Sequence, residues 1–115
     1  MLPTILHVQG DTLVRDIVVK RDGVAVDVSG WAWWVTCKQD PGAADAAALF
    51  QLSTVAGTIV PVATGRLRAT GAPALTVSAA PGRYHLDIQF KDAAGIIRTG
   101  FRGYLRIVPQ ITRAT

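Results

Sequence analysis

Few side chains in this 115-residue chain could act as a nucleophile or a general base. Its three serines, Ser29, Ser53 and Ser78, lie outside any Gly-x-Ser-x-Gly motif, and neither histidine has the surroundings expected in a catalytic triad. Such chemistry needs a nucleophile with an adjacent base, or two carboxylates in different environments. We therefore predict that the protein is not an enzyme.

The sequence does not indicate a cofactor or metal site. One cysteine and two histidines are too few for a dedicated zinc site, and no phosphate loop, dinucleotide fingerprint or calcium loop is present. Cys37 falls on the inward side of an expected strand, where a small buried side chain is expected rather than a reactive thiol. Asp11 and Asp16 could approach a shared site, although Gly10-Asp11-Thr12 is more typical of a turn or a strand start. We predict no cofactor, no metal and no small-molecule substrate.

The composition indicates one domain, residues 1–115, built from strands. Half of the residues are apolar and 17% are charged, which excludes a disordered chain. Glu and Asn are absent, whereas Val (13) and Thr (11) are abundant, and this balance favours strands over helices. No apolar run approaches the roughly 18 residues that span a bilayer, and Met1 is not followed by a basic and then apolar leader. We therefore expect neither a membrane span nor a secretory signal.

Turn signals such as Asp22-Gly23 and Pro81-Gly82 recur at intervals of roughly ten residues. Short alternating or β-branched segments separate them, which is the pattern of an all-β sandwich or barrel rather than of βαβ units. Residues 43–52 leave two alternatives open, because their alanines suit a short helix and their larger apolar residues suit a strand.

A hairpin within residues 84–108 has the most regular pattern. Apolar and polar side chains alternate strictly in its first strand, which predicts a half-buried antiparallel strand. Pairing Lys91 with Ile96 would place His85 opposite Arg102 and apolar side chains opposite one another. We therefore expect one continuous register along the hairpin.

The same alternation assigns a core. Residues 31–38 place Trp31 and Trp33 on one side of a strand and Trp34 on the other. Together with the hairpin, this predicts a core made of Trp31, Trp33, Val35, Tyr84, Leu86, Ile88, Phe90, Phe101, Leu105 and Ile107.

The outward side of the hairpin carries positive charge. The net charge is +4, and residues 61–115 contribute eight bases and only two acids. Arginine and tyrosine are enriched at contact hot spots, so we interpret this side as a docking face for an anion or a protein. The alternative is a solvated face partly neutralised by Asp87. The arginines lack the interleaved aromatic residues that stack on bases, so we do not expect nucleic acid to bind.

Trp34 is the second surface feature, because its position in the alternation opposes that of the core tryptophans. An outward indole usually has a partner, so we expect a subunit interface there. Cover by a loop, or a bulge that shifts the alternation, is the alternative. The candidate interface residues are Trp34, Arg98, Arg102, Tyr104 and Arg106.

The order of several motifs is similar to that of a known family. Gly10-Asp11-Thr12, Asp22-Gly23 and Val26-Asp27-Val28-Ser29-Gly30-Trp31 precede Gly82-Arg83-Tyr84 and the closing segment Arg102-Gly103-Tyr104-Leu105-Arg106-Ile107-Val108-Pro109. From about Gly10 to Arg113 the chain resembles small immunoglobulin-like β-sandwich structural proteins of tailed bacteriophages, which are related to the N-terminal module of baseplate upper proteins.

This resemblance implies an immunoglobulin-like antiparallel β-sandwich of seven or eight short strands. It also implies a virion structural protein of the tail, the baseplate or an adaptor, assembled in the host cytoplasm. Such a protein acts through contacts with copies of itself, as a symmetric homo-oligomer, and with other virion proteins. The resemblance carries over no catalytic residue.

Two other functions are alternatives. A carbohydrate-binding or host-adhesion sandwich would use exposed aromatic side chains, with Trp34 and Tyr104 as its platform. A head-decoration or neck protein would make the same kind of protein contacts at another place in the virion.

Overall fold

The computed structural model describes residues 2–111, and this part of the chain is almost entirely strands and turns. Arg113, the end of the segment that carries the family resemblance, lies outside the described residues. The strands are β1 (Thr4–Val8), β2 (Leu13–Val18), β3 (Lys20–Arg21), β4 (Val24–Ala25), β5 (Ala32–Lys38), β6 (Phe50–Ser53), β7 (Ile59–Ala63), β8 (Arg66–Gly71), β9 (Gly82–Lys91) and β10 (Ile97–Val108). Two 3₁₀ turns, η1 (Asp45–Ala47) and η2 (Pro73–Leu75), interrupt them.

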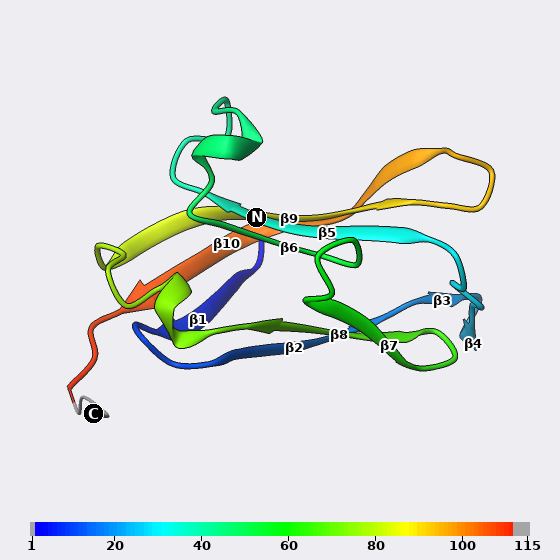
Figure 1. Cartoon of the computed structure of the whole chain (residues 1–115), viewed down its shortest axis with the longest axis horizontal. Coiled ribbons are helices and arrows are strands. Elements are labelled where there is room, and N and C mark those ends of the chain that lie inside the picture. The colour runs from blue at the N-terminus through cyan, green and yellow to red at the C-terminus, as the bar shows by residue number, and fades with distance from the viewer. Residues whose placement is uncertain (1, 112–115) are drawn as a thin grey trace.

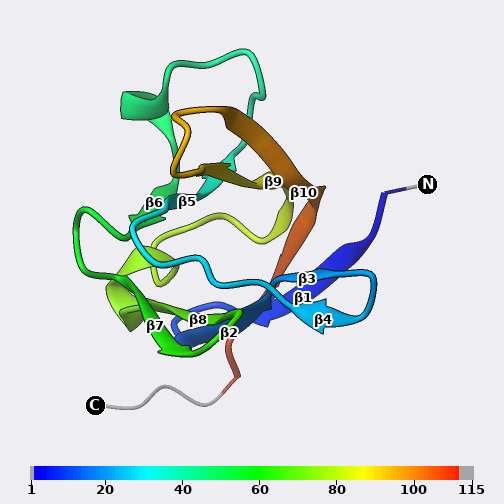
Figure 2. The ribbon, with the colours of Figure 1, turned by 90° about the vertical axis from the view of Figure 1, so that its right-hand side faces the viewer.

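Two sheets pack face to face, so the predicted all-β sandwich is confirmed. The larger sheet has the order β1-β10-β9-β5-β6 and the smaller one the order β2-β8-β7. Figure 1 shows β5, β9 and β10 in one layer and β2, β7 and β8 in the other. Figure 2 shows the two layers from the end, with the small β3–β4 hairpin leading on from β2. Over residues 2–111 the strands number ten, rather than seven or eight, partly because this small hairpin forms.

The ambiguous segment 43–52 ends in a strand, and its first half makes a single 3₁₀ turn rather than an α-helix. Its alanine-rich first half makes the single 3₁₀ turn η1, which buries no residue. Its apolar second half forms β6, in which Phe50 and Leu52 enter the core. Alanine has little apolar surface to bury, so this first half stays on the surface while the larger side chains fix the strand.

The predicted core is confirmed. Trp33, Val35, Tyr84, Leu86, Leu105 and Ile107 are buried, and Trp31, Ile88, Phe90 and Phe101 pack against them. Trp33 is only 2% exposed, and its ring stacks on that of Phe90 with 4.8 Å between centroids. The smaller sheet contributes Leu13, Ile59, Leu67 and Ala69 from the opposite side.

The predicted register of the β9–β10 hairpin is wrong. The turn closes one residue later, because Asp92 N–H donates to the Ile96 carbonyl at 3.1 Å and Lys91 pairs with Ile97. A second shift, a β-bulge, lies between Thr99 and Phe101. Beyond the bulge, Arg102 faces Asp87 and Tyr104 faces His85 in the register. An extra residue on one strand changes which face each later side chain occupies.

Strand β1 joins the larger sheet by running parallel to β10. Tyr104 N–H donates to the Pro3 carbonyl at 2.9 Å, at the start of this pairing. A Cβ on the buried Gly103 would lie 2.5 Å from the Pro3 oxygen, so only glycine lets β1 approach this closely. The absence of a side chain at Gly103 therefore lets β1 pack against β10 at the edge of the larger sheet.

Candidate binding surface

The outer face of the larger sheet, on the side away from the smaller sheet, carries four of the five predicted interface residues. On β5, Trp33 and Val35 are buried in the core, so Trp34 between them projects outward. On β10, Leu105 and Ile107 are buried, and the side chains that alternate with them face outward in the same way: Arg102, Tyr104 and Arg106.

Arg98 does not lie on this face, so its prediction as an interface residue beside Arg102 and Arg106 is wrong. It lies before the bulge at Gly100, and it lines a cavity between the two sheets together with Phe101, Trp31 and Trp33. The bulge reverses the alternation, so Arg98 and Arg102 lie on opposite sides of the sheet although they are four residues apart. For the same reason Ile97 is 57% exposed and lines the outer face.

A groove of about 460 Å³ runs across the outer face beside Trp34. Its floor comes from β5, β9 and β10. The residues that line it are Leu2, Trp34, Thr36, Lys38, Pro41, Asp45, Gln51, His85, Leu86, Asp87, Gln89, Ile97, Arg102 and Gly103. The segment that carries η1 rises above the larger sheet, as Figure 1 shows, and forms one wall.

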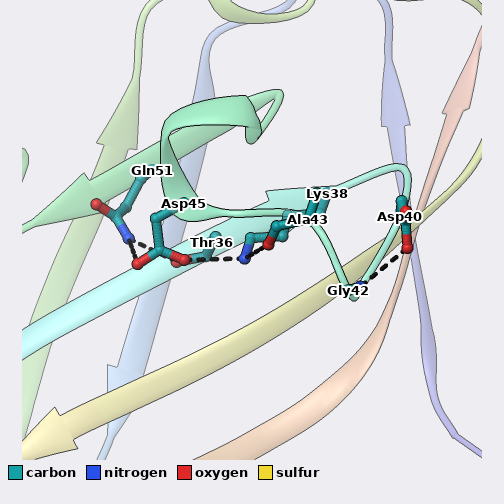
Figure 3. Close-up of polar contacts among 7 residues, drawn as sticks. All are labelled: Thr36, Lys38, Asp40, Gly42, Ala43, Asp45 and Gln51. Carbon is teal, nitrogen blue, oxygen red and sulfur yellow. Dashed lines mark hydrogen bonds and ion pairs between the residues drawn. The ribbon is translucent and has the colours of Figure 1, made fainter.

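Polar contacts fix this wall onto the sheet (Figure 3). Lys38 Nζ lies 2.9 Å from Asp45 Oδ1 and donates to the Ala43 carbonyl at 2.6 Å. Gln51 Nε2 donates to Thr36 Oγ1 at 3.0 Å and to Asp45 Oδ2 at 3.4 Å. The hydrogen bond from Lys38 holds the pKa of Asp45 below its usual range. These contacts therefore fix the segment that forms the wall against the larger sheet.

Asp87 lies in the middle of the groove floor. In the register it faces Thr36 on one side and Arg102 on the other. Burial raises the pKa of its carboxyl group, although the positive charges of Lys38 and Arg102 act in the opposite direction. Within residues 2–111 this carboxylate makes no hydrogen bond or ion pair with another side chain. It is a half-buried acceptor with unused hydrogen-bonding capacity.

A second cluster lies further along the same face, and we call it the basic strip: Arg83, Tyr104 and Arg106, with His85 between it and the groove. The Arg83 guanidinium carbon lies 4.3 Å from the centre of the Tyr104 ring, and the His85 ring lies 5.3 Å from it. Arg83 and Arg106 are direct cross-strand neighbours. The two ion pairs of the described residues are Lys38–Asp45 and Arg68–Asp16, so neither neutralises the strip.

Exposed apolar side chains border the basic strip on β1. Leu6 is the register partner of Arg106 and is 64% exposed, and Val8 follows it on the same face. The alternate residues of β1 point the other way, as the buried His7 shows. The strip therefore combines cations, an aromatic ring and apolar surface, a composition typical of protein contact sites.

Trp34 and Tyr104 do not form the shared platform considered for a sugar. Trp34 pairs with Gln89 and Tyr104 with His85, so the two rings are four residues apart along β9, or about 13 Å. They also stand on the two strands that flank β9. The groove and the basic strip are thus adjacent on one face, and His85 lines the groove while its ring packs beside Tyr104.

The other candidate residues do not assemble into a reactive site. Cys37 is fully buried, and burial raises the pKa of its thiol to about 12. Asp16 is held by Arg68 at 2.9 Å, and no hydrogen bond joins it to the exposed Asp11. In the described part of the chain no three His, Cys or acidic side chains come together as metal ligands would. Nor does any helix of that part have the length and apolarity to cross a membrane.

Sequence reasoning missed the groove but could have found part of it. Asp87 and Gln89 face outward at alternate positions of β9, as the strand pattern predicts. Their partners on β5, Thr36 and Trp34, also occupy alternate outward positions. The wall was not predictable, because no local pattern shows that Asp45 folds back onto Lys38. A comparison of the chain with protein-family models and with curated proteins finds no match.

Proposed function

We propose that this protein is a non-catalytic structural module of a tailed-bacteriophage virion, a tail, baseplate or adaptor component. It docks onto acidic surfaces of copies of itself and of other virion proteins through the basic strip. The similarity of its motif order to that of phage β-sandwich proteins supports a role in a tailed-bacteriophage particle. The cross-strand pair of Arg83 and Arg106 beside Tyr104 supports the docking surface, and it is the observation that carries the proposal.

Two like charges directly opposite each other in a sheet destabilise the isolated protein. Arg83 and Arg106 occupy such positions, and neither has an acidic partner among the described residues. A carboxylate from a partner would remove the repulsion and accept hydrogen bonds from both guanidinium groups. The arrangement suits binding better than it suits the stability of the monomer.

The surroundings of the pair suit a protein rather than a free anion. Tyr104 supplies an aromatic ring of the kind found at interface hot spots, and Leu6 adds exposed apolar area beside the charges. The described residues measure 42 × 31 × 28 Å along their principal axes. A face of this size can supply the roughly 800 Å² per partner that a stable interface buries.

The test is incorporation into particles. The gene is replaced in its phage by variants that encode Arg83→Glu, Arg106→Glu or, as the control, Arg66→Glu, and the purified particles are analysed by quantitative mass spectrometry. Arg66 is exposed on the smaller sheet, so its reversal changes the net charge equally. We expect the wild type and the control in the particles, and at least a tenfold loss for the other two. Absence of the wild-type chain from purified particles, or equal incorporation of all variants, would refute the proposal.

The head-decoration or neck alternative predicts the same variants to fail. The two functions differ in the position of the chain in the particle: the alternative places it at the capsid or its portal instead of at the tail.

A further inference from the structure

The groove beside Trp34 adjoins the basic strip at His85 but shares no residue with it, and its chemistry suits a different ligand. Its volume of about 460 Å³ lies within the range of roughly 300–1,000 Å³ typical of small-molecule sites. Trp34 is half-buried there, so part of its ring lines the groove. A flat apolar ring at a polar site matches a ligand that has one apolar face.

The floor beside Trp34 supplies hydrogen-bonding side chains at regular spacing. Gln89 is the register partner of Trp34, and Asp87 is that of Thr36 on the next outward position. Outward positions of neighbouring strands lie about 5 Å apart, so these groups present a small array of donors and acceptors. Asp87 is the member with unused acceptor capacity, as its unpaired carboxylate shows.

The charges around the groove nearly cancel. Lys38 is already paired with Asp45, and Asp87 faces Arg102 across the β9–β10 pair. A phosphate or a nucleic acid would meet the Asp87 carboxylate and would find Lys38 engaged. A neutral ligand rich in hydroxyl groups is neither attracted nor repelled by these charges, and it can form hydrogen bonds with the polar side chains.

An extended peptide fits the floor less well than a sugar does. The central strands β5, β9 and β10 have neighbours on both sides, so their backbone groups are used within the sheet. A peptide could not add itself there as a further strand, and recognition must come from side chains alone. The wall held by Lys38 and Gln51 is already ordered, which lowers the entropic cost of binding a small rigid ring.

We infer that this groove binds a neutral sugar residue of a glycan, with one face of the ring on Trp34 and its hydroxyl groups on Asp87 and Gln89. This binding site uses none of the residues of the basic strip. A module with both sites would attach to its assembly through one cluster and contact a glycan through the other.

The test begins with the purified full chain on an array of neutral, sialylated and sulfated oligosaccharides. The strongest neutral binder is then titrated by calorimetry against the wild type and the variants Trp34→Ala and Asp87→Ala. Tyr104→Ala is the matched control, because it removes an aromatic ring from the same face outside the groove. If Trp34→Ala does not fold, Gln89→Ala, which truncates an exposed side chain, takes its place.

We expect saturable binding of a neutral oligosaccharide, a loss of affinity of about tenfold or more in both groove variants, and no change in Tyr104→Ala. Binding of only sulfated or sialylated glycans would overturn the inference, as would no saturable binding at all or an equal loss in the Tyr104 variant. The basic-strip variant Arg83→Glu should bind the sugar normally, so a failure of docking and a failure of sugar binding are distinguishable.

Discussion

The guanidinium of Arg83 lies over the ring of Tyr104, 4.3 Å from its centre, on the outer face of the larger sheet. Its cross-strand neighbour is a second arginine, Arg106. The Tyr104 ring orients the Arg83 guanidinium, whereas Arg106 repels it. The cluster is therefore ordered, but its positive charge is not neutralised. This relationship underlies the proposed docking role, and it predicts a trade-off between stability and assembly.

Replacing Arg106 with Gln should stabilise the isolated domain slightly while weakening docking. Removal of one of two opposed like charges favours the folded state by at most about 1 kcal/mol. Thermal unfolding at low salt should therefore show a raised midpoint, and the gain should shrink as salt screens the repulsion. A lowered midpoint at low salt would contradict the description of Arg83 and Arg106 as an unrelieved pair.

Trp33 and Trp34 are adjacent in sequence, yet their truncation should have very different costs. Trp33→Ala removes a buried ring stacked on Phe90 and should lower the free energy of unfolding by about 3–5 kcal/mol. Trp34→Ala affects a half-buried ring on the outer face and should cost about 1 kcal/mol or less. Urea denaturation of the two variants measures both values, and similar costs would be evidence against the assigned faces.

Trp33→Phe provides a finer test at the same position. The indole nitrogen of Trp33 is buried without a hydrogen-bond partner among the described residues. A phenyl ring keeps part of the stack and removes the unsatisfied donor, so Trp33→Phe should lose clearly less stability than Trp33→Ala. An equal loss in the two variants would show that neither the ring stack nor the unpaired donor matters there.

Gly103→Ala should loosen β1 from the sheet. The added methyl group would meet the Pro3 carbonyl at 2.5 Å, so the strand must shift, at a cost of about 1–3 kcal/mol. Hydrogen exchange should show reduced protection of the Tyr104 amide, which donates to that carbonyl. Unchanged protection and stability would mean that β1 does not pass this close to β10.

Asp87 should give the domain a characteristic dependence on pH. Burial raises the pKa of this carboxyl in the folded chain above the ordinary value of 3.8, so the folded state disfavours the charged form. The destabilisation by this residue therefore develops as pH rises above 3.8 and is complete above the folded pKa. Asp87→Asn should raise the unfolding midpoint at pH 7, and this gain should vanish below pH 3.8. A gain that persists at lower pH would assign the effect to something other than charge.

The alternation of β9 and β5 made the core and its outward faces predictable from sequence. Each strand is half-buried, so a period of two separates Trp33 from Trp34 and Leu86 from Asp87 without knowledge of the neighbours. Parallel pairing of β1 with β10 could not be predicted in the same way, because it depends on contacts between the two ends of the chain.

The position of Arg98 shows where pattern reasoning fails. Its parity matched that of Arg102, but one extra residue at Gly100 reverses the faces. Glycine within a strand is a sign of a bulge, so a signal was present in the sequence. Its effect on register depended on how the turn closed at Asp92 and Ile96, which alternation alone does not determine.

The most direct test of the docking proposal is a cryo-electron microscopy map of purified particles that contain the wild-type chain. The proposal predicts that the outer face of the larger sheet is covered by a neighbouring subunit, with acidic side chains against Arg83 and Arg106 and contact at Tyr104. A map in which this face points to solvent, while the chain is attached through its smaller sheet, would contradict it.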